Sequence, residues 1–266
     1  MAELYSYRDD QIYCHHSLDP TPDSTDFSMH IHDRMEVLAV LSGAGHFLVE
    51  GSDYPLHGGD VLVLRPLETH RLLIRPEEPY ERVAIHFDPA LIEAVEPRLL
   101  SPFRDRPLGS GNLYAGTAYP ALYRPFADFD FSRSELPRAN ILARLLSFLT
   151  ELADAAPRTP CLPPPDEAGR LVGYVNERLF ESLSLADLGR RFRKSEAQIA
   201  RDFRRATGST FGDYVRIKRL LAAQGMLLQG IPASRVCLQC GYGDYSAFFR
   251  AYKAYFGTSP TRRSAR

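Results

Sequence analysis

Three histidines and one glutamate are spaced as the ligands of an ion, or the polar lining of a pocket, would be. His30, His32 and Glu36 form an HxHxxxE pattern, and His70 follows beyond the next predicted hairpins. If residues 29–32 form a strand, His30 and His32 project to the same face, because side chains alternate along a strand. Imidazole and carboxylate groups converging in the mouth of a barrel suit a divalent transition metal.

The elements that must position these residues are short strands. Apolar runs occupy residues 37–41, 46–49, 61–64 and 83–87, with Gly, Asp and Pro between them. A spacing of about ten residues between such runs predicts an antiparallel β-barrel or sandwich.

Two helices are predicted after the strands. Asp88 followed by Pro89 is typical of an N-cap and the first position of a short helix. Residues 138–155 carry Leu and Ile at i, i+4, i+8 and i+11, which predicts an amphipathic helix. This second helix could cover the barrel, or it could pack against the same helix of a second copy in a dimer.

The His/Glu spacing resembles the cupin fold. The first cupin motif is matched by His30, His32, Glu36 and Gly43, and the second more loosely by Gly59, Pro66 and His70. Glu68 stands where the second motif has an internal Gly, and the closing Asn is absent. The resemblance implies that His30, His32, Glu36 and His70 could hold a metal. We favour a second interpretation, in which these residues line a metal-free pocket for a small-molecule effector, and we therefore expect no cofactor. In a third interpretation, some of these histidines only form hydrogen bonds at a strand edge.

The charge of the chain is distributed very unevenly. The 266 residues have a net charge of -1, but residues 1–167 carry -12 and residues 168–266 carry +11. Such asymmetry points to nucleic acid as the partner of the basic half. All 8 histidines lie in the acidic half.

Several protein classes are excluded by the same survey. No apolar run reaches the roughly 18 residues of a membrane span, and the N-terminus lacks the pattern of a signal peptide. Cys14, Cys161, Cys237 and Cys240 include one isolated CxxC pair, which lacks the further ligands of a structural zinc site. We therefore interpret the cysteines as reduced, with Cys237 and Cys240 in a core, and expect a cytoplasmic protein without a membrane partner.

A proline-rich segment separates the two halves. Residues 157–167 contain five prolines, and this composition excludes a helix or an inner strand. The sequence therefore predicts two domains joined by a linker, at residues 1–156, 157–167 and 168–266. The fold class is α+β, with an N-terminal antiparallel β-barrel and an all-α C-terminal domain.

The C-terminal half contains two helix-turn-helix outlines. Ser184 and Ser195 are placed as N-caps of two short helices, and Gly208 is placed to end the second. After a long helix over 211–228, a short helix, a turn and a helix over 244–255 repeat the outline.

These helices resemble the DNA-binding domain of the AraC/XylS family of bacterial transcription regulators. The motifs that carry the resemblance are Ser184-Leu185-x-x-Leu188, Phe203-Arg204-x-x-x-Gly208, Phe211-x-x-Tyr214 and Gly241-Tyr242-x-Asp244-x-Ser246-x-Phe248-x-Arg250. Gly189 departs from the usual Ala and, because Gly in a helix costs about 1 kcal/mol relative to Ala, predicts a less stable first unit. A cupin-like effector domain is also typical of this family.

The resemblance implies that two helices enter adjacent major grooves. The base-facing positions are Ala197, Gln198 and Arg201 in the first helix and Tyr245, Ser246 and Arg250 in the second. The positions that would neutralise phosphate are Arg204, Arg205 and Lys253. Arg can pair with guanine and Gln with adenine through two hydrogen bonds each, which is the chemistry that base recognition requires.

The sequence as a whole predicts a ligand-responsive, sequence-specific transcription regulator and not an enzyme. Its expected partners are double-stranded promoter DNA, a small-molecule effector with a sugar as the candidate, a second copy in a homodimer, and RNA polymerase if it activates transcription. The alternative is a metal-dependent cupin enzyme with an accessory DNA-binding tail, for which His30, His32, Glu36 and His70 would carry the chemistry.

Overall fold

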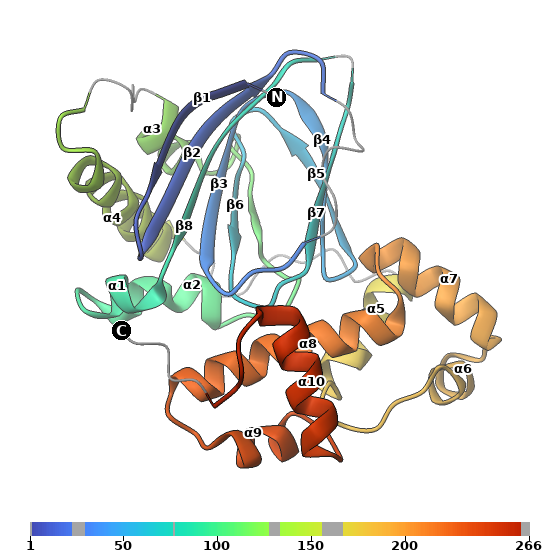
Figure 1. The fold of residues 1–266 in the computed structure, drawn as a ribbon. Coiled ribbons are helices and arrows are strands. Elements are labelled where there is room, and N and C mark those ends of the chain that lie inside the picture. Colours follow the sequence, from blue (N-terminus) through green and yellow to red (C-terminus); the bar gives the residue numbers. More distant parts are fainter. Residues whose placement is uncertain (1, 23–29, 77, 128–133, 156–166, 262–266) are drawn as a thin grey trace. The chain divides into compact units, whose positions relative to one another are not determined.

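The computed structural model describes residues 2–22, 30–76, 78–127, 134–155 and 167–261 (Figure 1). The chain divides into two compact units, residues 1–165 and 166–266. The predicted proline-rich linker lies outside the described residues, except for Glu167. Among the described helices, none combines the length and the apolar character that crossing a bilayer needs.

The described residues of the first unit form nine antiparallel strands. They are β1 (Ala2–Arg8), β2 (Ile12–Asp19), β3 (Met35–Ser42), β4 (Ala44–Val49), β5 (Ser52–His57), β6 (Val61–Leu64), β7 (His70–Ile74), β8 (Tyr80–Phe87) and β9 (Leu113–Tyr114). One sheet has the order β1-β2-β8-β3-β6-β9 and the other has the order β5-β4-β7. The predicted antiparallel β domain is confirmed, and within the described residues its strands form two sheets, not one closed ring.

The larger sheet buries both of its faces. One face packs on the smaller sheet through residues such as Leu38, Phe47 and Leu72. The opposite face packs on helices through residues such as Ile85, Phe103 and Leu145. Figure 1 shows α3 and α4 lying along this second face. Burial on both faces explains why β3 and β6 are apolar almost throughout, with no alternation.

The helices of the first unit follow the strands. They are α1 (Pro89–Glu93), the 3-10 helix η2 (Pro97–Leu100), α2 (Ser101–Arg104), α3 (Pro120–Ala127) and α4 (Pro137–Ala155). The Asp88 side chain accepts a hydrogen bond from Ala90 N and Pro89 begins α1, as predicted. The apolar stripe of α4, which includes Ile141, Leu145 and Leu149, is buried in the core beside the sheet.

One local expectation about the first unit is wrong. Of residues 30–32, His30 alone forms an isolated bridge, to His70, so the predicted strand over 29–32 does not form in its described part. The hairpin between β4 and β5 turns at Glu50 and Gly51, both at positive φ. Two residues at positive φ match the twist of a tight hairpin.

All regular elements in the described part of the second unit are helices. Its helices are α5 (Glu167–Glu177), α6 (Leu185–Phe192), α7 (Glu196–Thr207), α8 (Phe211–Leu228), α9 (Ala233–Gln239) and α10 (Tyr245–Phe256). Leu188, Ile199 and Phe203 belong to one buried cluster, whereas Cys237 and Phe248 belong to another. Each helix-turn-helix therefore has its own core, and α8 contributes to both. Burial of Cys237 and Cys240 confirms their interpretation as core residues.

The caps of the two helix-turn-helix units follow from their sequences. Ser184 forms a reciprocal capping box with Asp187, and Ser195 accepts from Gln198 N. Asp244 caps α10 through the backbone N–H groups of Ser246 and Ala247, and Gly208 ends α7 at a φ of 68°. These caps satisfy donors and acceptors that would otherwise be left at the helix ends.

Gly189 has a packing role that its helix propensity does not reveal. A Cβ atom at this position would lie 2.8 Å from the carbonyl oxygen of Lys194, a backbone atom in the turn between α6 and α7. Arg193 in the same turn adopts a left-handed conformation, with φ of 55°. Helix propensity alone predicts that Gly189 weakens the first helix-turn-helix, whereas this contact leaves no room for a side chain at the position.

Candidate functional site: a histidine-glutamate cluster and two exposed helix faces

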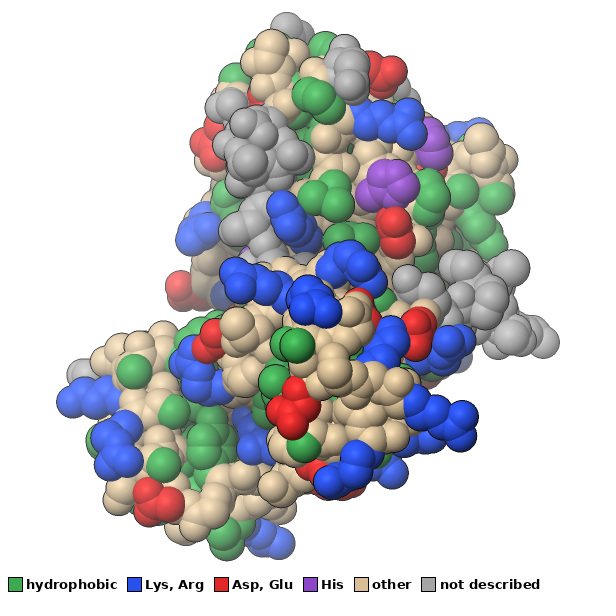
Figure 2. Space-filling view, turned by 90° about the vertical axis from the view of Figure 1, so that its right-hand side faces the viewer, with side chains coloured by type: hydrophobic (Ala, Val, Ile, Leu, Met, Phe, Trp, Pro, Cys, Tyr) green, Lys and Arg blue, Asp and Glu red, His purple; other side chains and the backbone are tan. Residues whose placement is uncertain are grey.

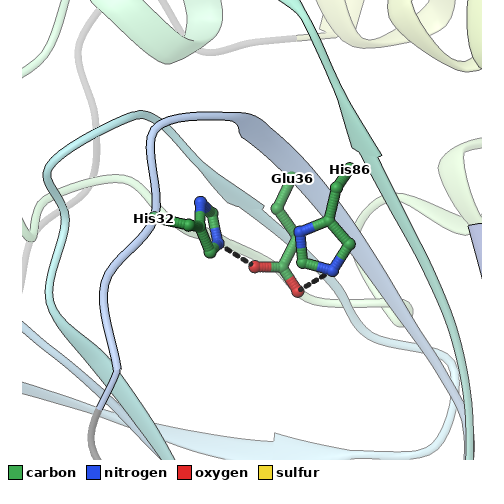
Figure 3. A group of neighbouring side chains, drawn as sticks. All are labelled: His32, Glu36 and His86. Atoms are coloured by element: carbon green, nitrogen blue, oxygen red, sulfur yellow. Dashed lines mark hydrogen bonds and ion pairs between the residues drawn. The ribbon is translucent and has the colours of Figure 1, made fainter. Parts of the chain in front are cut away.

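Glu36 is the centre of the polar cluster in the first unit. It lies on β3, is 5% exposed, and is paired in register with Leu64 on β6 and His86 on β8. Figure 3 shows His32 and His86 on opposite sides of its carboxylate, with both rings directed toward it. His32 lies in the segment that leads directly into β3, and His70, at the start of β7, also faces Glu36. The cluster therefore combines residues from β3 with its preceding segment, from β7 and from β8.

Three imidazole nitrogens converge on this carboxylate. His32 Nε2 lies 2.8 Å from Glu36 Oε2, and His70 Nε2 lies 3.4 Å from the same oxygen. His86 Nε2 lies 3.8 Å from Glu36 Oε1. Ligand atoms of His32, Glu36 and His86 all lie within 4.8 Å of one another. Imidazole nitrogen and carboxylate oxygen are a donor set that fits divalent transition metals.

Backbone carbonyl groups orient two of the rings. His32 Nδ1 donates to the carbonyl oxygen of Arg34 at 3.0 Å, and His70 Nδ1 donates to that of Glu68 at 2.8 Å. These hydrogen bonds assign the Nδ1 protons, so Nε2 is the atom that each ring presents to Glu36. A histidine held this way by its second nitrogen has the arrangement common among metal ligands.

Burial and neighbouring groups shift the pKa values of His86, His32 and Glu36. Burial lowers the pKa of His86 to about 4, so this ring is neutral at physiological pH. Burial also opposes the charged form of His32, but the hydrogen bond and charge of Glu36 outweigh it and raise the His32 pKa. For Glu36, burial acts to raise the pKa, and the surrounding imidazoles of His86, His32 and His70 outweigh burial and hold it well below its usual range. The hydrogen bond between His32 and Glu36 thus favours the charged form of both side chains.

The structure brings together three of the four histidine and glutamate positions predicted from sequence, and adds one. His32, Glu36 and His70 meet, whereas His30 is exposed and joins His70 through two backbone hydrogen bonds. His86 was not among the predicted site residues. A signal for it existed, because strand alternation over residues 83–87 places His86 on the face opposite Ile85, and pairing of β8 with β3 makes this the face that carries Glu36.

A small polar cavity adjoins the cluster. Its volume is about 180 Å³, and its lining residues are Arg8, Asp9, Tyr13, His32, Asp33, Arg34 and His86. The Arg8 guanidinium lies over the Tyr13 ring, 4.0 Å from its centroid. The cavity is smaller than the roughly 300–1,000 Å³ of sites for drug-sized ligands, so it suits an ion or a small polar molecule.

A buried ion pair fixes the turn that leads into His70. Arg106 donates two hydrogen bonds to the Glu68 carboxylate, at 2.6 and 2.8 Å, and Gly109 N and Asn112 Nδ2 each donate one more at 3.0 Å. The Glu68 backbone, in turn, holds the His70 ring. The substitution of the second cupin motif's Gly by Glu68 therefore has a structural reason.

The predicted DNA contacts on α7 lie on its exposed face with one exception. Ala197, Arg201, Arg204 and Arg205 are exposed, whereas Gln198 is half-buried. Gln198 Nε2 donates to buried Asp202 at 2.8 Å, and its oxygen accepts from Arg201 at 2.7 Å. Asp202 also accepts hydrogen bonds from Lys194 and Arg205. The Gln198 amide is thus held in place by its neighbours.

The corresponding residues of α10 are all exposed. Phe248 and Tyr252 are buried on the inner face, which leaves the outer face to the predicted contact residues Tyr245, Ser246, Arg250 and Lys253. Figure 2 shows Lys and Arg side chains spread over the visible face of the helical unit. Both second helices therefore present basic or hydrogen-bonding side chains to solvent.

Comparisons with known proteins match both units. The family described as an AraC-like ligand binding domain matches residues 18–154, and a helix-turn-helix domain family matches residues 188–266. The uncharacterized HTH-type transcriptional regulator YbfI of Bacillus subtilis is 20% identical over 83% of this chain and 80% of its own length. The regulatory protein SoxS of Escherichia coli is 27% identical over 34% of this chain and 86% of its own length.

Two further proteins also show similarity to this chain. The probable transcriptional regulator LumQ of Photobacterium leiognathi is 33% identical over 34% of this chain, and the match spans 36% of LumQ. The crystal structure of ToxT from Vibrio cholerae aligns over 92% of this chain and 95% of its own, with 11% identity and a TM-score of 0.39. The two domain matches, which together cover most of the chain, show that it belongs to the AraC family of transcription regulators.

Proposed function

We propose that α7 and α10 are the two DNA-recognition helices of this regulator. The observation that carries the proposal is that each lies second in a helix-turn-helix with its own core and leaves its polar face exposed. The base contacts would be made by Ala197, Gln198, Arg201, Tyr245, Ser246 and Arg250. The phosphate contacts would be made by Arg204, Arg205 and Lys253. Because Arg201 holds the oxygen of Gln198, the two side chains would approach one base step together.

Single substitutions test this assignment. Operator sites are first located by genome-wide mapping of bound DNA, and affinities are then measured by fluorescence anisotropy on an operator and a scrambled duplex. Arg201→Ala and Arg250→Ala should each lose about 1–3 kcal/mol, roughly 5- to 150-fold in Kd, on the operator, with a smaller loss on the scrambled duplex. Arg216→Ala removes an exposed charge on α8 that pairs with Asp213, and is the control. Wild-type affinities for both duplexes in both variants would contradict the assignment.

We also propose that the cavity beside Glu36 is the effector site. Its Arg, Asp, His and Tyr side chains offer both donors and acceptors, a lining that suits a small polar molecule such as a sugar. Ligand binding would favour one of two arrangements of a homodimer and so change the half-sites that it spans. If the protein activates transcription, RNA polymerase is a further partner. A regulatory role in the cytoplasm, without catalysis, is the one consistent with the family.

The effector site is tested by footprinting the operator with and without candidate ligands. Sugars and other small polar metabolites that bind the free protein should alter the footprint of the wild type. Tyr13→Ala, which removes one wall of the cavity and the partner of Arg8, should weaken ligand binding without changing the footprint of the ligand-free protein. An identical footprint with and without every bound ligand would contradict the proposed role.

A further inference from the structure

The donor atoms around Glu36 have the spacing that a coordinated ion requires. Ligands at about 2.0–2.1 Å from a tetrahedral ion lie roughly 3.3 Å from one another. The three distances from Glu36 oxygens to imidazole Nε2 atoms, at 2.8, 3.4 and 3.8 Å, bracket that value. Such convergence of three rings on one carboxylate is more than a single histidine-glutamate ion pair needs.

His70 provides an independent sign that the cluster holds an ion. The residue is 1% exposed, and within the described part of the chain its Nε2 has no hydrogen-bond partner. This atom lies 3.4 Å from Glu36 Oε2, outside hydrogen-bond geometry. Because Nδ1 of the same ring donates to the carbonyl oxygen of Glu68, Nε2 is the nitrogen that faces the carboxylate. A buried ring nitrogen without a hydrogen-bond partner is costly, and a cation between it and the carboxylate would satisfy both groups.

His30 does not share this environment. Its side chain is exposed, and its ring packs edge-on against His70 with centroids 4.1 Å apart. Within the described residues, the group whose ligand atoms all lie within 4.8 Å of one another consists of His32, Glu36 and His86, without His30. His70 joins this group through its Nε2 atom, 3.4 Å from Glu36 Oε2. The cupin resemblance implies His30 as a ligand, and the geometry of this chain replaces it.

We propose that a divalent transition-metal ion binds to His32, Glu36, His70 and His86, and that His30 lies outside the ligand set. The proposal deepens the effector pocket proposed above, because His32 and His86 also line its cavity. The ion is therefore either the effector itself or part of the wall that contacts it. Binding to the free protein is independent of DNA, so the metal site and the recognition helices can fail separately.

Matched variants of the full chain test the ligand set. Protein purified without an affinity tag is stripped with chelator, and Zn²⁺ or Ni²⁺ is then titrated by calorimetry, with bound metal counted by elemental analysis. The wild type and His30→Gln should each bind about one ion per chain, whereas Glu36→Gln and His86→Gln should bind less than about one tenth of that. DNA binding is measured on the same samples.

Chemical modification of histidines in the wild-type protein tests the same ligand set without any variant, and so does not depend on whether a variant folds. Diethyl pyrocarbonate modifies accessible histidine nitrogens, and mass spectrometry identifies each site. Added Zn²⁺ should protect His32 and His86 and leave His30 reactive. The proposal is overturned if the wild type binds no ion, or if His30→Gln loses the ion while His86→Gln retains it. Retained DNA binding in either case would leave the proposed recognition helices standing.

Discussion

Arg106 neutralises a carboxylate that has almost no access to water. The Glu68 side chain is fully buried, and that of Arg106 is 3% exposed. Replacing Arg106 with Met keeps much of the side-chain volume but removes the charge and both hydrogen bonds to the Glu68 carboxylate. Because loss of one partner leaves the other charge buried and unpaired, we expect the free energy of unfolding of the first unit to fall by about 3–5 kcal/mol.

Differential scanning calorimetry at pH 7 measures the effect. A loss of 1 kcal/mol lowers Tm by about 2–4 °C in a unit of this size, so Arg106→Met should lower it by roughly 6–20 °C. Arg98→Met is the matched control, because Arg98 pairs with Glu96 at the surface and is 86% exposed. Because that pair is exposed to solvent, Arg98→Met should leave Tm close to the wild-type value. A loss of less than about 1 kcal/mol in Arg106→Met would refute the reasoning.

The pH dependence of stability gives a second, independent check. Burial acts to raise the pKa of Glu68, but hydrogen bonds and charge from Arg106 outweigh it and lower the pKa below 4.5. A depressed folded-state pKa contributes stability above about pH 4.5, and this contribution is lost as pH falls through the folded-state value. The difference in stability between wild type and Arg106→Met should therefore shrink on acidification from pH 7, and a difference that grows would contradict the assignment.

Three further outcomes are expected. Gly189→Ala should lower the Tm of the second unit, because overpacking against Lys194 costs roughly 1–3 kcal/mol in the free energy of unfolding. A rise in Tm would show that helix propensity dominates. Lys253→Ala should weaken binding to operator and scrambled DNA alike and reduce the slope of log K against log salt by about 1, whereas an unchanged slope would remove Lys253 from the phosphate contacts. In a Cys161→Ser background, Cys240 should react with iodoacetamide at pH 8 at least roughly 100-fold more slowly than a free thiol, because burial raises its pKa from 9.0 to about 11; rapid labelling of the native protein would contradict this.

Local sequence signals predict the second unit well because its helices are bounded by their own residues. Ser184, Ser195 and Gly208 act within a turn of where they stand in the sequence, so their roles can be read without tertiary information. The Gly189 contact with Lys194 depends on the path of the turn, which helix propensity does not describe. Helix propensity and packing therefore predict effects of opposite sign for Gly189→Ala.

The histidine-glutamate cluster is less accessible to sequence reasoning because strand register assembles it. Glu36 and His86 are fifty residues apart in the chain and meet only because β3 pairs with β8 in one particular register. The HxHxxxE spacing finds His32 and Glu36, but it treats His30 as equivalent to His32, and the absence of a strand at residues 31–32 breaks that equivalence. Neither β1 nor β2, whose residues line the cavity, was predicted from the pattern of apolar runs.

The separate cores of the two helix-turn-helix units have a consequence for how this regulator can change. A substitution that repacks Phe203 does not touch the cluster around Phe248, and effects of substitutions without shared neighbours add. If α7 and α10 are the two recognition helices, mutations that change the DNA contacts of one should therefore leave the affinity of the other unaltered. Descendants of this protein would then be able to exchange one half of an operator at a time, through intermediates that still bind DNA by the other half.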